Sequence, residues 1–465
     1  MTMLGAKIAA ARAVGGLARR AGRGGGTSLP GKVLMALEPG AISELSARLP
    51  RGSVVISATN GKTTTAAMVA SVLRQAGVPA VHNRAGANMA GGVASTLLAA
   101  ARGGGRIDGE LGLFEVDEFW LDQVTPELHP RGILLGNLFR DQLDRYGELE
   151  TIADRWAAMT SSIGPSARLV LNADDPLIAD LGRDATNVTY FGIEDPSVAT
   201  PEMQHASDSK HCRRCGAAYV YDAIYLGHLG RYYCPSCGQR RPAPSVAAER
   251  ISLDGTRRSS FELTTPVGNA MVELPLPGLY NVYNALGAAA LCLGLELPLT
   301  AVVAGLRDVQ AAFGRAERIA IGDVELQVLL IKNPAGANEI LRTLVLEHED
   351  LDVLAILNDR VADGRDVSWV WDADFEMLAG RVRRVTCAGT RAAELAVRLK
   401  YAGVADDRLH VTPSLPAALD EALAAVESGH LYALPTYTAL LELRQELADR
   451  GHAVRFWEPQ AVARR

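Results

Sequence analysis

A lysine and a threonine that follow a tight polar loop have the most specific chemistry in this 465-residue chain. The run SVVISATNGKTTT starts as a short apolar strand, turns at Asn60 and Gly61, and continues as a helix from Lys62. Backbone N–H groups at such a turn face an anion, a lysine reaches terminal phosphates, and a hydroxyl such as that of Thr63 can hold Mg2+. The pattern predicts a loop that binds a nucleoside triphosphate.

The loop departs in one place from the complete pattern GxxxxGK[ST], which would have a glycine where this chain has Ile56. An ordinary turn leading into a helix therefore remains an alternative. The flanking strand and helix favour phosphate binding, because both stand where that chemistry needs them. The expected nucleotide-binding residues of the loop are Thr59, Asn60, Gly61, Lys62, Thr63 and Thr64.

Four of the six cysteines form a second pattern, CxxC followed after eighteen residues by CxxC. They are Cys212, Cys215, Cys234 and Cys237. This spacing is typical of a zinc ribbon, in which two turns each offer two thiolates to one tetrahedral Zn2+. Four sulfur ligands leave no open position, so the zinc should be structural. A redox pair, disulfides or a nucleic-acid-binding ribbon are the alternatives.

Composition and charge are those of a soluble α/β enzyme of two or three domains. Hydrophobic residues make up 48% of the chain, the mean hydropathy is +0.07 and the net charge is -6, which gives no reason to expect affinity for nucleic acid. The basic first 26 residues are expected to be a frayed terminus, with a loose amphipathic helix on an anionic membrane as the alternative. We expect a cytoplasmic protein, at most in peripheral contact with the inner face of a membrane.

Alternating apolar runs and helical patterns predict a parallel α/β sheet around the loop. Strands are expected in LGLFEVDE, RGILLGNLF and ARLVLNADD, each ending in polar residues where a parallel sheet places its ligand crevice. Glu115 and Asp117 end the first of these strands and are candidate Mg2+ ligands. Solvation of the strand end is the alternative.

The second half of the chain predicts an insertion, a helix and a further parallel α/β unit. A helix introduced by Pro277 carries Asn281 and Asn284 one turn apart, so both amides can face one ligand, although Asn281 could instead cap the helix. Cys292 and Cys387 should be buried small hydrophobes. The expected organisation is an N-terminal segment (1–50) that packs on or leads into the central domain, a central domain (51–310) with a zinc-ribbon insertion at about 205–242, and a C-terminal α/β domain (311–465).

Several motifs, in this order, resemble those of Mur ligases. They are TNGKTTT from Thr59, the strand-end Glu115, NLFRDQLDRYGE from Asn137, NADDP from Asn172, YNVYNALGA from Tyr280 and GRAER from Gly314. The resemblance implies a central ATPase domain with a Rossmann-like C-terminal domain. It also implies that a carboxylate is activated by ATP and Mg2+ as an acyl phosphate, which an amine then attacks.

Together with the four-cysteine ribbon, two further runs resemble the MurT branch of these ligases. They are KNPAGANEIL from Lys332 and ADGRDVSWVWDADFE from Ala362. The resemblance implies ATP-dependent amidation of the α-carboxylate of D-glutamate in lipid II or a related peptidoglycan precursor. It also implies a separate GatD-type glutaminase subunit as the source of ammonia.

The resemblance also implies roles for individual residues. Asn281 and Asn284 would contact the nucleotide base, Arg315 and Lys332 would reach ATP from the C-terminal domain, and Mg2+ would lie on Thr63 and Glu115. Three positions depart from the wider pattern. Ala58 replaces a glycine, which the loop accepts if its φ stays negative. Gln142 replaces a histidine and Trp156 falls near a carbamylated lysine, so a second Mg2+ stays an open question.

An acidic segment with interleaved tryptophans suggests a contact with the partner. A carboxylate there could orient the histidine of a glutaminase Cys-His pair, with Asp366 as first choice and Asp363 as second. Trp369 and Trp371 would suit a protein interface. A solvated acidic loop is the alternative.

Two other functions compete with amidation. One is a ligase that joins a free amino acid to a carboxylate, as folylpolyglutamate synthases do, and it needs no glutaminase. The other is a zinc-ribbon regulator that binds ATP without substrate-dependent release of phosphate.

Overall fold

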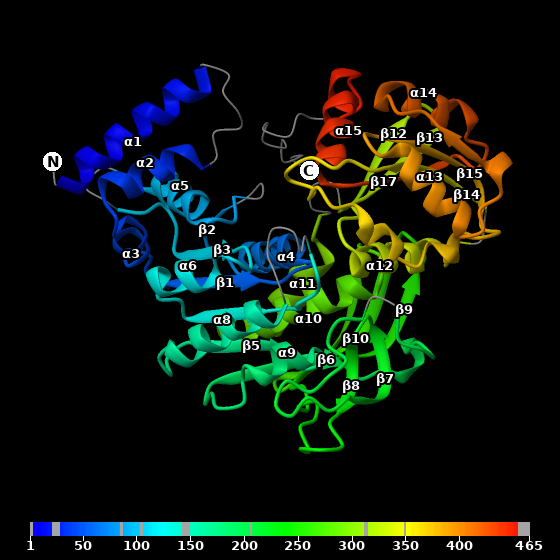
Figure 1. Cartoon of the computed structure of the whole chain (residues 1–465). Coiled ribbons are helices and arrows are strands. Elements are labelled where there is room, and N and C mark those ends of the chain that lie inside the picture. The colour runs from blue at the N-terminus through cyan, green and yellow to red at the C-terminus, as the bar shows by residue number, and fades with distance from the viewer. Residues whose placement is uncertain are drawn as a thin grey trace.

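A nine-stranded sheet forms the larger part of the computed structural model (Figure 1). The structure describes residues 3–20, 28–83, 87–102, 106–141, 149–204, 207–310, 315–347 and 350–453. The strand order is β11-β10-β9-β6-β5-β4-β1-β3-β2. The strands are β1 (Ser53–Ser57), β2 (Ala80–His82), β3 (Leu111–Glu115), β4 (Gly132–Leu135), β5 (Arg168–Asn172), β6 (Val188–Ile193), β9 (Val246–Asp254), β10 (Arg258–Thr265) and β11 (Gly268–Leu274).

This sheet is parallel from β2 to β9 and antiparallel from β9 to β11. Successive side chains of a strand point to opposite faces, and both faces are buried. Val54 and Ile56 therefore join one hydrophobic core, while Val55 joins the other. All three predicted strands of the region are present as β3, β4 and β5, and their polar carboxyl ends lie beside the end of β1.

Helices cover both faces of the sheet. The first core contains α4 (Lys62–Gln75), α10 (Leu279–Gly294) and α11 (Leu299–Arg307). The second core contains α2 (Leu29–Leu37), α3 (Ala41–Ser46), α5 (Ala90–Ala100), α6 (Leu121–Leu128), α8 (Leu149–Ser162) and α9 (Pro176–Asp180). We call this sheet with its helices the larger unit.

The expectation of a frayed N-terminus was wrong for residues 3–20. They form α1 (Met3–Arg20), which buries Ile8 and Ala11 against the second core. The Arg12 guanidinium donates a hydrogen bond of 2.7 Å to the carbonyl of Leu98 in the last turn of α5, where a cation also meets the negative end of the helix dipole. Across the described ranges, no helix combines the length and apolar character that crossing a bilayer requires.

A six-stranded sheet, β12-β13-β17-β14-β15-β16, forms the smaller unit beside the larger one (Figure 1). Its strands are β12 (Arg315–Ile321), β13 (Val324–Leu329), β14 (Leu351–Ile356), β15 (Val382–Ala388), β16 (Leu409–Val411) and β17 (His430–Pro435). Its helices are α12 (Pro334–Leu344), α13 (Ala392–Tyr401), α14 (Leu415–Ala425) and α15 (Tyr437–Asp449). The predicted parallel sheet is present, with β12 added as an antiparallel edge strand.

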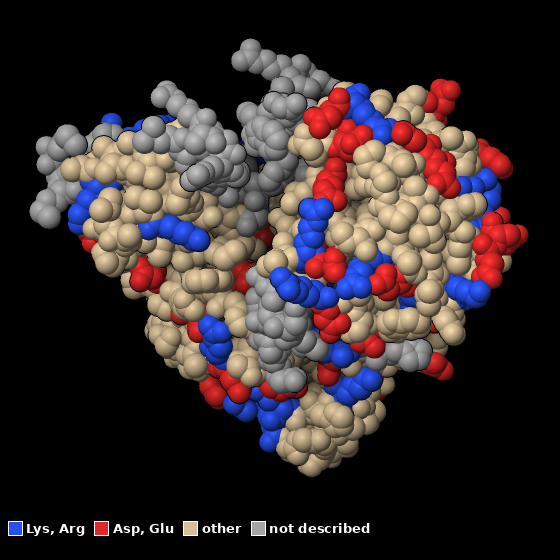
Figure 2. All heavy atoms as spheres, turned by 45° about the horizontal axis from the view of Figure 1, so that its top comes forward, with Lys and Arg blue, Asp and Glu red and all other residues tan. Residues whose placement is uncertain are grey.

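Acidic and basic side chains are interspersed over the smaller unit on the face shown in Figure 2. The chain between β6 and β9 includes the hairpin of β7 (Val220–Leu226) and β8 (Leu229–Tyr233), which form a two-stranded sheet with isolated bridges to Thr200 and Arg240. Short 3-10 helices complete the described elements. They are η2 (Pro196–Val198), η3 (Ser368–Trp371), η4 (Phe375–Leu378) and η5 (Asp406–Arg408).

The two units meet through polar contacts near the loop after β1. Asn60 and Asn333 exchange two side-chain hydrogen bonds of 3.2 and 3.1 Å. On α12, the guanidinium of Arg342 donates to the carbonyl of Tyr225 at 2.7 Å. The start of α12 therefore faces the predicted nucleotide loop.

Candidate nucleotide and metal sites

The turn before α4 needs glycine for two separate reasons. Gly61 has a φ of +88°, in the left-handed region that side chains disfavour. A Cβ there would also lie 2.0 Å from Oδ1 of Asn284. Asn284 accepts a hydrogen bond of 3.3 Å from the Thr65 hydroxyl, so the helix α10 is in direct contact with the turn. Ala58 is not among the described non-glycine residues with positive φ. The expectation that φ stays negative where alanine replaces glycine is therefore met.

Asn137, which follows β4, holds the backbone of the turn. Its Oδ1 accepts from the Asn60 N–H at 2.9 Å, and its Nδ2 donates to the Asn60 carbonyl at 3.0 Å. The Thr59 hydroxyl accepts from the backbone N–H of Phe139 at 3.1 Å. The turn is thus fixed from its neighbouring strand, with a buried Lys62 at the start of the helix.

Lys62 is held between a carbonyl and a carboxylate. Its Nζ donates to the Ala58 carbonyl at 3.1 Å and to Oε2 of Glu118 at 3.0 Å. Burial alone would lower the pKa of Lys62, but Glu118, Asp117 and Glu115 outweigh it and raise that pKa above its usual value. Burial likewise opposes the charge of Glu118, and Lys62 with Lys332 overcomes it and lowers the pKa of Glu118. Lys62 is therefore a fixed cation.

Two of the three candidate magnesium ligands, Thr63 and Glu115, are adjacent. The Thr63 hydroxyl donates to Oε1 of Glu115 at 2.8 Å, and Glu115 is buried at the end of β3. A hydroxyl and a carboxylate are oxygen donors of the kind that Mg2+ takes. Burial and the neighbouring Glu118 raise the pKa of Asp117. The donor set fits Mg2+ at this strand end.

A cavity of about 100 Å³ lies between the turn, α10 and the smaller unit. Asn60, Gly61, Thr64, Asn281, Asn284 and Lys332 are among the residues that line it. The Asn281 amide donates to the Pro277 carbonyl at 2.7 Å and accepts from Asn284 at 3.1 Å. The capping alternative for Asn281 was wrong, because this amide satisfies no helix N–H group.

Lys332 comes to this cavity from the smaller unit and forms an ion pair with Asp141. Burial raises the pKa of Asp141, although Lys332 opposes the shift. Arg315 pairs through its backbone with Leu329 at the start of β12, and its side chain lies outside the described part of the chain. Gln142 also lies outside it.

The four cysteines of the predicted ribbon converge. Their sulfur atoms all lie within 4.8 Å of one another, with Cys212 to Cys237 at 3.5 Å and Cys215 to Cys234 at 3.4 Å. Four sulfurs around a tetrahedral Zn2+ would be about 3.8 Å apart. Hydrogen bonds within the cluster separate the cysteine pKa values: backbone N–H groups of Cys237 and Ser236 lower the pKa of Cys234, while the neighbouring sulfurs raise the pKa of Cys237. The donor set fits a structural zinc.

The two candidate carboxylates of the acidic segment differ in their surroundings. Asp363 is buried and accepts hydrogen bonds from the N–H and hydroxyl of Thr438 in the first turn of α15. Asp366 is exposed and accepts from the Ser368 N–H at 2.8 Å, and the Ser368 hydroxyl together with this N–H lowers the pKa of Asp366. Asp363 therefore holds the fold of the segment, whereas Asp366 faces solvent.

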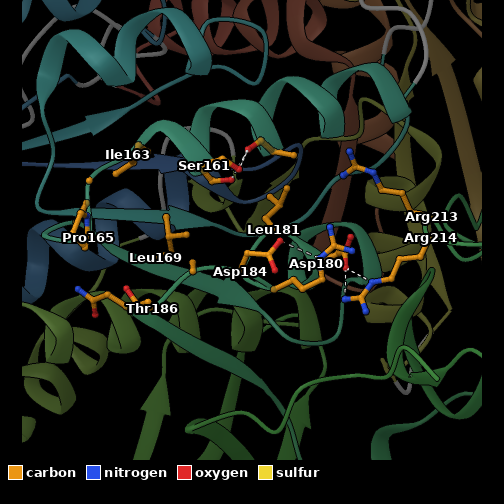
Figure 3. Close-up of a pocket in the computed structure, with 17 residues that line it drawn as sticks. Ser161, Ile163, Pro165, Leu169, Asp180, Leu181, Asp184, Thr186, Arg213 and Arg214 are labelled. Carbon is orange, nitrogen blue, oxygen red and sulfur yellow. Dashed lines mark hydrogen bonds and ion pairs between the residues drawn. The ribbon is translucent and has the colours of Figure 1, made fainter. Parts of the chain in front are cut away.

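A larger cavity lies elsewhere. It measures about 550 Å³ and lies beside residues 163–167, ahead of β5, at the amino end of a strand whose carboxyl end faces the nucleotide loop (Figure 3). Its charged side chains are paired: Arg214 with Asp180, Arg213 with Asp154 and Arg183 with Asp184. Such internal neutralisation leaves little to attract a phosphate.

Comparison with known proteins identifies the family. The family model described as "Mur ligase middle domain" matches residues 56–232, and the one described as "MurT ligase C-terminal" matches residues 330–440. A MurT subunit of lipid II isoglutaminyl synthase from Streptococcus pneumoniae is 31% identical over 92% of this chain and 93% of its own length. This chain belongs to the MurT family. A MurT subunit from Staphylococcus aureus is 32% identical over 93% of this chain and 95% of its own length.

Solved structures show the same fold outside the MurT family. A pseudomurein peptide ligase type C from Methanothermus fervidus has a TM-score of 0.66 at 22% identity, covering 86% of this chain and 79% of its own. MurF from Acinetobacter baumannii has a TM-score of 0.64 at 18% identity, covering 90% and 80%. The predicted Mur ligase fold is confirmed.

Sequence reasoning missed four residues that build the site of this MurT family member. Glu118 and Asp141 pair with the two lysines, while Asn137 and Asn333 hold the turn. Glu118 could have been found from the run EVDE, whose three carboxylates lie at or just after the end of β3. Trp156 is fully buried and donates from Nε1 to the Glu118 carbonyl at 3.0 Å, so it supports a carboxylate and is itself no metal ligand.

Proposed function

We propose that this chain is the ATP-dependent synthetase subunit of a lipid II isoglutaminyl synthase. In this reaction the α-carboxylate of D-glutamate in the lipid II stem peptide becomes an amide, giving D-isoglutamine. The observation that carries the proposal is the match to MurT subunits over more than 90% of the chain. The proposal is also supported by the position of the loop after β1, which lines the cavity between the two units.

The geometry supports phosphoryl transfer from ATP to a carboxylate. Loop N–H groups and the fixed cation Lys62 would stabilise negative charge on the transferred phosphoryl group. Thr63 and Glu115 would hold Mg2+, which supplies charge neutralisation at the phosphates when bound. Lys62 and Lys332 are now paired with Glu118 and Asp141, so ATP would replace these carboxylates as the partner of each lysine.

The binding of ATP would connect the two units. Asn281 and Asn284 would contact the base from α10, and Lys332 and Arg315 would act from the smaller unit. The contact between Asn60 and Asn333 already brings the turn and the start of α12 together. Closure around ATP would exclude water, which matters because an acyl phosphate hydrolyses readily.

Ammonia would come from a GatD-type glutaminase subunit that docks on the smaller unit. Asp366 is the exposed carboxylate that could orient the histidine of the partner's Cys-His pair. Near it in sequence, Trp371 is 52% exposed and its ring centroid lies 5.9 Å from that of Tyr401, which is 74% exposed. Exposed aromatic side chains of this kind are common anchors of protein interfaces.

Mass spectrometry of lipid II tests the proposal. The chain is incubated with ATP, Mg2+ and lipid II, with glutamine plus a co-expressed GatD-type glutaminase in one arm and with an ammonium salt in the other. We expect amidated product in both arms and none with glutamine alone. Phosphate release that depends on a free amino acid, with no amide in any arm, would reject the proposal in favour of an amino-acid ligase.

A further inference from the structure

The tip of the four-cysteine hairpin reaches the cavity beside the nucleotide loop. Leu226 ends β7 and Leu229 begins β8, and both line the cavity that Asn60, Gly61 and Asn284 also line. Leu226 is 5% and Leu229 1% exposed, so the wall that they form is apolar and buried. The amides of α10 belong to the lining of the same cavity. An apolar wall near a few polar groups is typical of sites for flat ligands such as nucleotide bases.

The turn between these two leucines is anchored under the same site. His228 is fully buried, with its ring centroid 4.6 Å from that of Phe139 and its Nε2 3.5 Å from Oδ2 of Asp175. Phe139 itself lines the cavity. Gly227 has a φ of +55°, and a Cβ there would lie 2.9 Å from the Phe139 ring. The turn is therefore shaped to fit against Phe139.

A second contact joins the base of the hairpin to α10. Arg241, four residues after the last cysteine, pairs with the buried carboxylate of Asp174. The Tyr283 hydroxyl, which lies on α10 between the two asparagines, donates to the same carboxylate at 2.6 Å. Asp174 also accepts the N–H of Gly230 through its backbone carbonyl at 2.9 Å. The hairpin and the asparagine helix thus share one buried anion.

The hairpin cannot be expected to hold this position by itself. Outside their own pairing, its two strands make only isolated bridges within the described chain, to Thr200 and Arg240, and a two-stranded hairpin without further support is marginal in water. The four cysteines fasten its open end, where each CxxC turn is followed by a glycine of positive φ, Gly216 and Gly238. Metal binding at such a site contributes directly to the stability of the fold around it.

We propose that the four-cysteine ribbon is a working part of the nucleotide site: Leu226 and Leu229 form the wall against the base, and the metal-fastened hairpin sets the affinity for the nucleotide. The inference rests on the proposed function only in that the chain must bind an adenine nucleotide. It assigns these two leucines as positioning residues for the base. The phosphates are held elsewhere, by the loop after β1.

Binding measurements on the full chain with ADP and with tripolyphosphate test this wall. In Leu226→Ala/Leu229→Ala the ADP affinity should fall about tenfold, because apolar contact with the base is lost. Tripolyphosphate has no base, and its affinity should stay unchanged. The matched control is Val220→Ala, which shortens a 41% exposed side chain of the same hairpin and should change neither affinity. Zinc content and thermal unfolding are followed for every variant.

If the double variant unfolds early, Leu226→Val and Leu229→Val shorten the same wall more gently and should still weaken ADP binding selectively. Equal ADP affinity in wild type and folded wall variants would overturn the inference while leaving the proposed function intact. A wild-type chain that binds neither ADP nor ATP would instead reject the proposed function.

The metal is tested through the two exposed cysteines. Cys215→Ser/Cys237→Ser should lose zinc and bind ADP more weakly than wild type, with tripolyphosphate affinity retained. Loss of zinc from a folded chain with unchanged ADP affinity would overturn the role given to the metal. Both readouts are independent of amidation activity.

Discussion

Lys62 and Glu118 form a buried ion pair of 3.0 Å at the mouth of the phosphate loop, where the side chain of each is 9% exposed. The lysine follows β1 and the glutamate follows β3, which are hydrogen-bonded neighbours in the parallel sheet. The pair keeps the lysine charged and directed at the loop in the absence of a phosphate. The same ion pair therefore stabilises the fold locally and holds Lys62 in position to bind the phosphates of ATP.

Replacing Glu118 should affect both properties. In Glu118→Gln the unfolding free energy should fall by about 2–3 kcal/mol, because a buried cation loses its charged partner. ATP-dependent amidation should also fall, since Lys62 is less well placed. The control is Glu110→Gln, an exposed partner of Arg51, which should stay within about 0.5 kcal/mol of wild type. Chemical denaturation with an amidation assay measures both. Unchanged stability in Glu118→Gln would show that the pair is dispensable.

The same pair should give a pH dependence of stability. The folded pKa of Glu118 is lowered below the 4.5 of an unperturbed glutamate. Its contribution to stability is therefore complete above pH 4.5 and is lost as pH falls through the folded pKa. The difference in unfolding free energy between wild type and Glu118→Gln should be constant at higher pH and shrink below 4.5. A difference that grows on acidification would contradict this assignment.

The contact between Gly61 and Asn284 can be tested separately from the positive φ of Gly61. Gly61→Ala should lose nucleotide binding, because its Cβ would displace the Asn284 amide from the turn. Gly77→Ala is the matched control, with a φ of +69° just after the same helix and no atom within 4 Å of a new Cβ. Each should cost about 1 kcal/mol in backbone strain, but only Gly61→Ala should weaken ADP binding. Equal ADP affinities in calorimetry would disprove the role of the contact.

Asp366 and Asp363 should give different phenotypes. Asp366→Asn should keep its stability and its ammonium-dependent amidation, while glutamine-dependent amidation with the partner falls roughly 100-fold or more. Asp363→Asn should lose about 1–2 kcal/mol of stability, because it holds the first turn of α15. The exposed Asp407→Asn serves as control for Asp366. Normal glutamine use by Asp366→Asn would remove it from the proposed triad.

Trp371 and Tyr401 should anchor the partner subunit. Trp371→Ala/Tyr401→Ala should raise the dissociation constant for the glutaminase about 30-fold or more, corresponding to roughly 2 kcal/mol. Val267→Ala, also strongly exposed but on the larger unit, should leave it unchanged. Surface plasmon resonance with the purified glutaminase gives both values. Equal constants for all three chains would place the interface elsewhere.

The sequence was sufficient for patterns that are local. The turn at Gly61, the strand ending in Glu115 and the two CxxC turns each need only a few neighbouring residues, and all are present. The pairing of Asn60 with Asn333 was out of reach, because it joins residues 273 positions apart with no pattern between them. The run EVDE did not indicate which of its carboxylates would meet Lys62, because that depends on the path of the chain after β3.

Other expectations failed because tertiary contacts overrode composition. The alanine- and glycine-rich start looked frayed, yet Ile8 and Ala11 find a core to bury against and Arg12 finds carbonyls at the end of α5. The ribbon was expected as an insertion in the central domain, and its cysteine pattern does not indicate where its tip lies. Its tip could be placed beside the nucleotide loop only once the fold of β5 and the position of Phe139 were known.

The contact between the amides of Asn60 and Asn333 can form only late in synthesis on the ribosome, because the two residues lie 273 positions apart. The larger sheet can assemble while the chain is still growing, but the cavity gains Lys332, Ala335 and Ile340 only after residues far along the chain have emerged. A nascent chain that lacks α12 would therefore have an open phosphate loop, because these residues do not yet cover the cavity. We expect tight binding of nucleotide only after α12 has been translated.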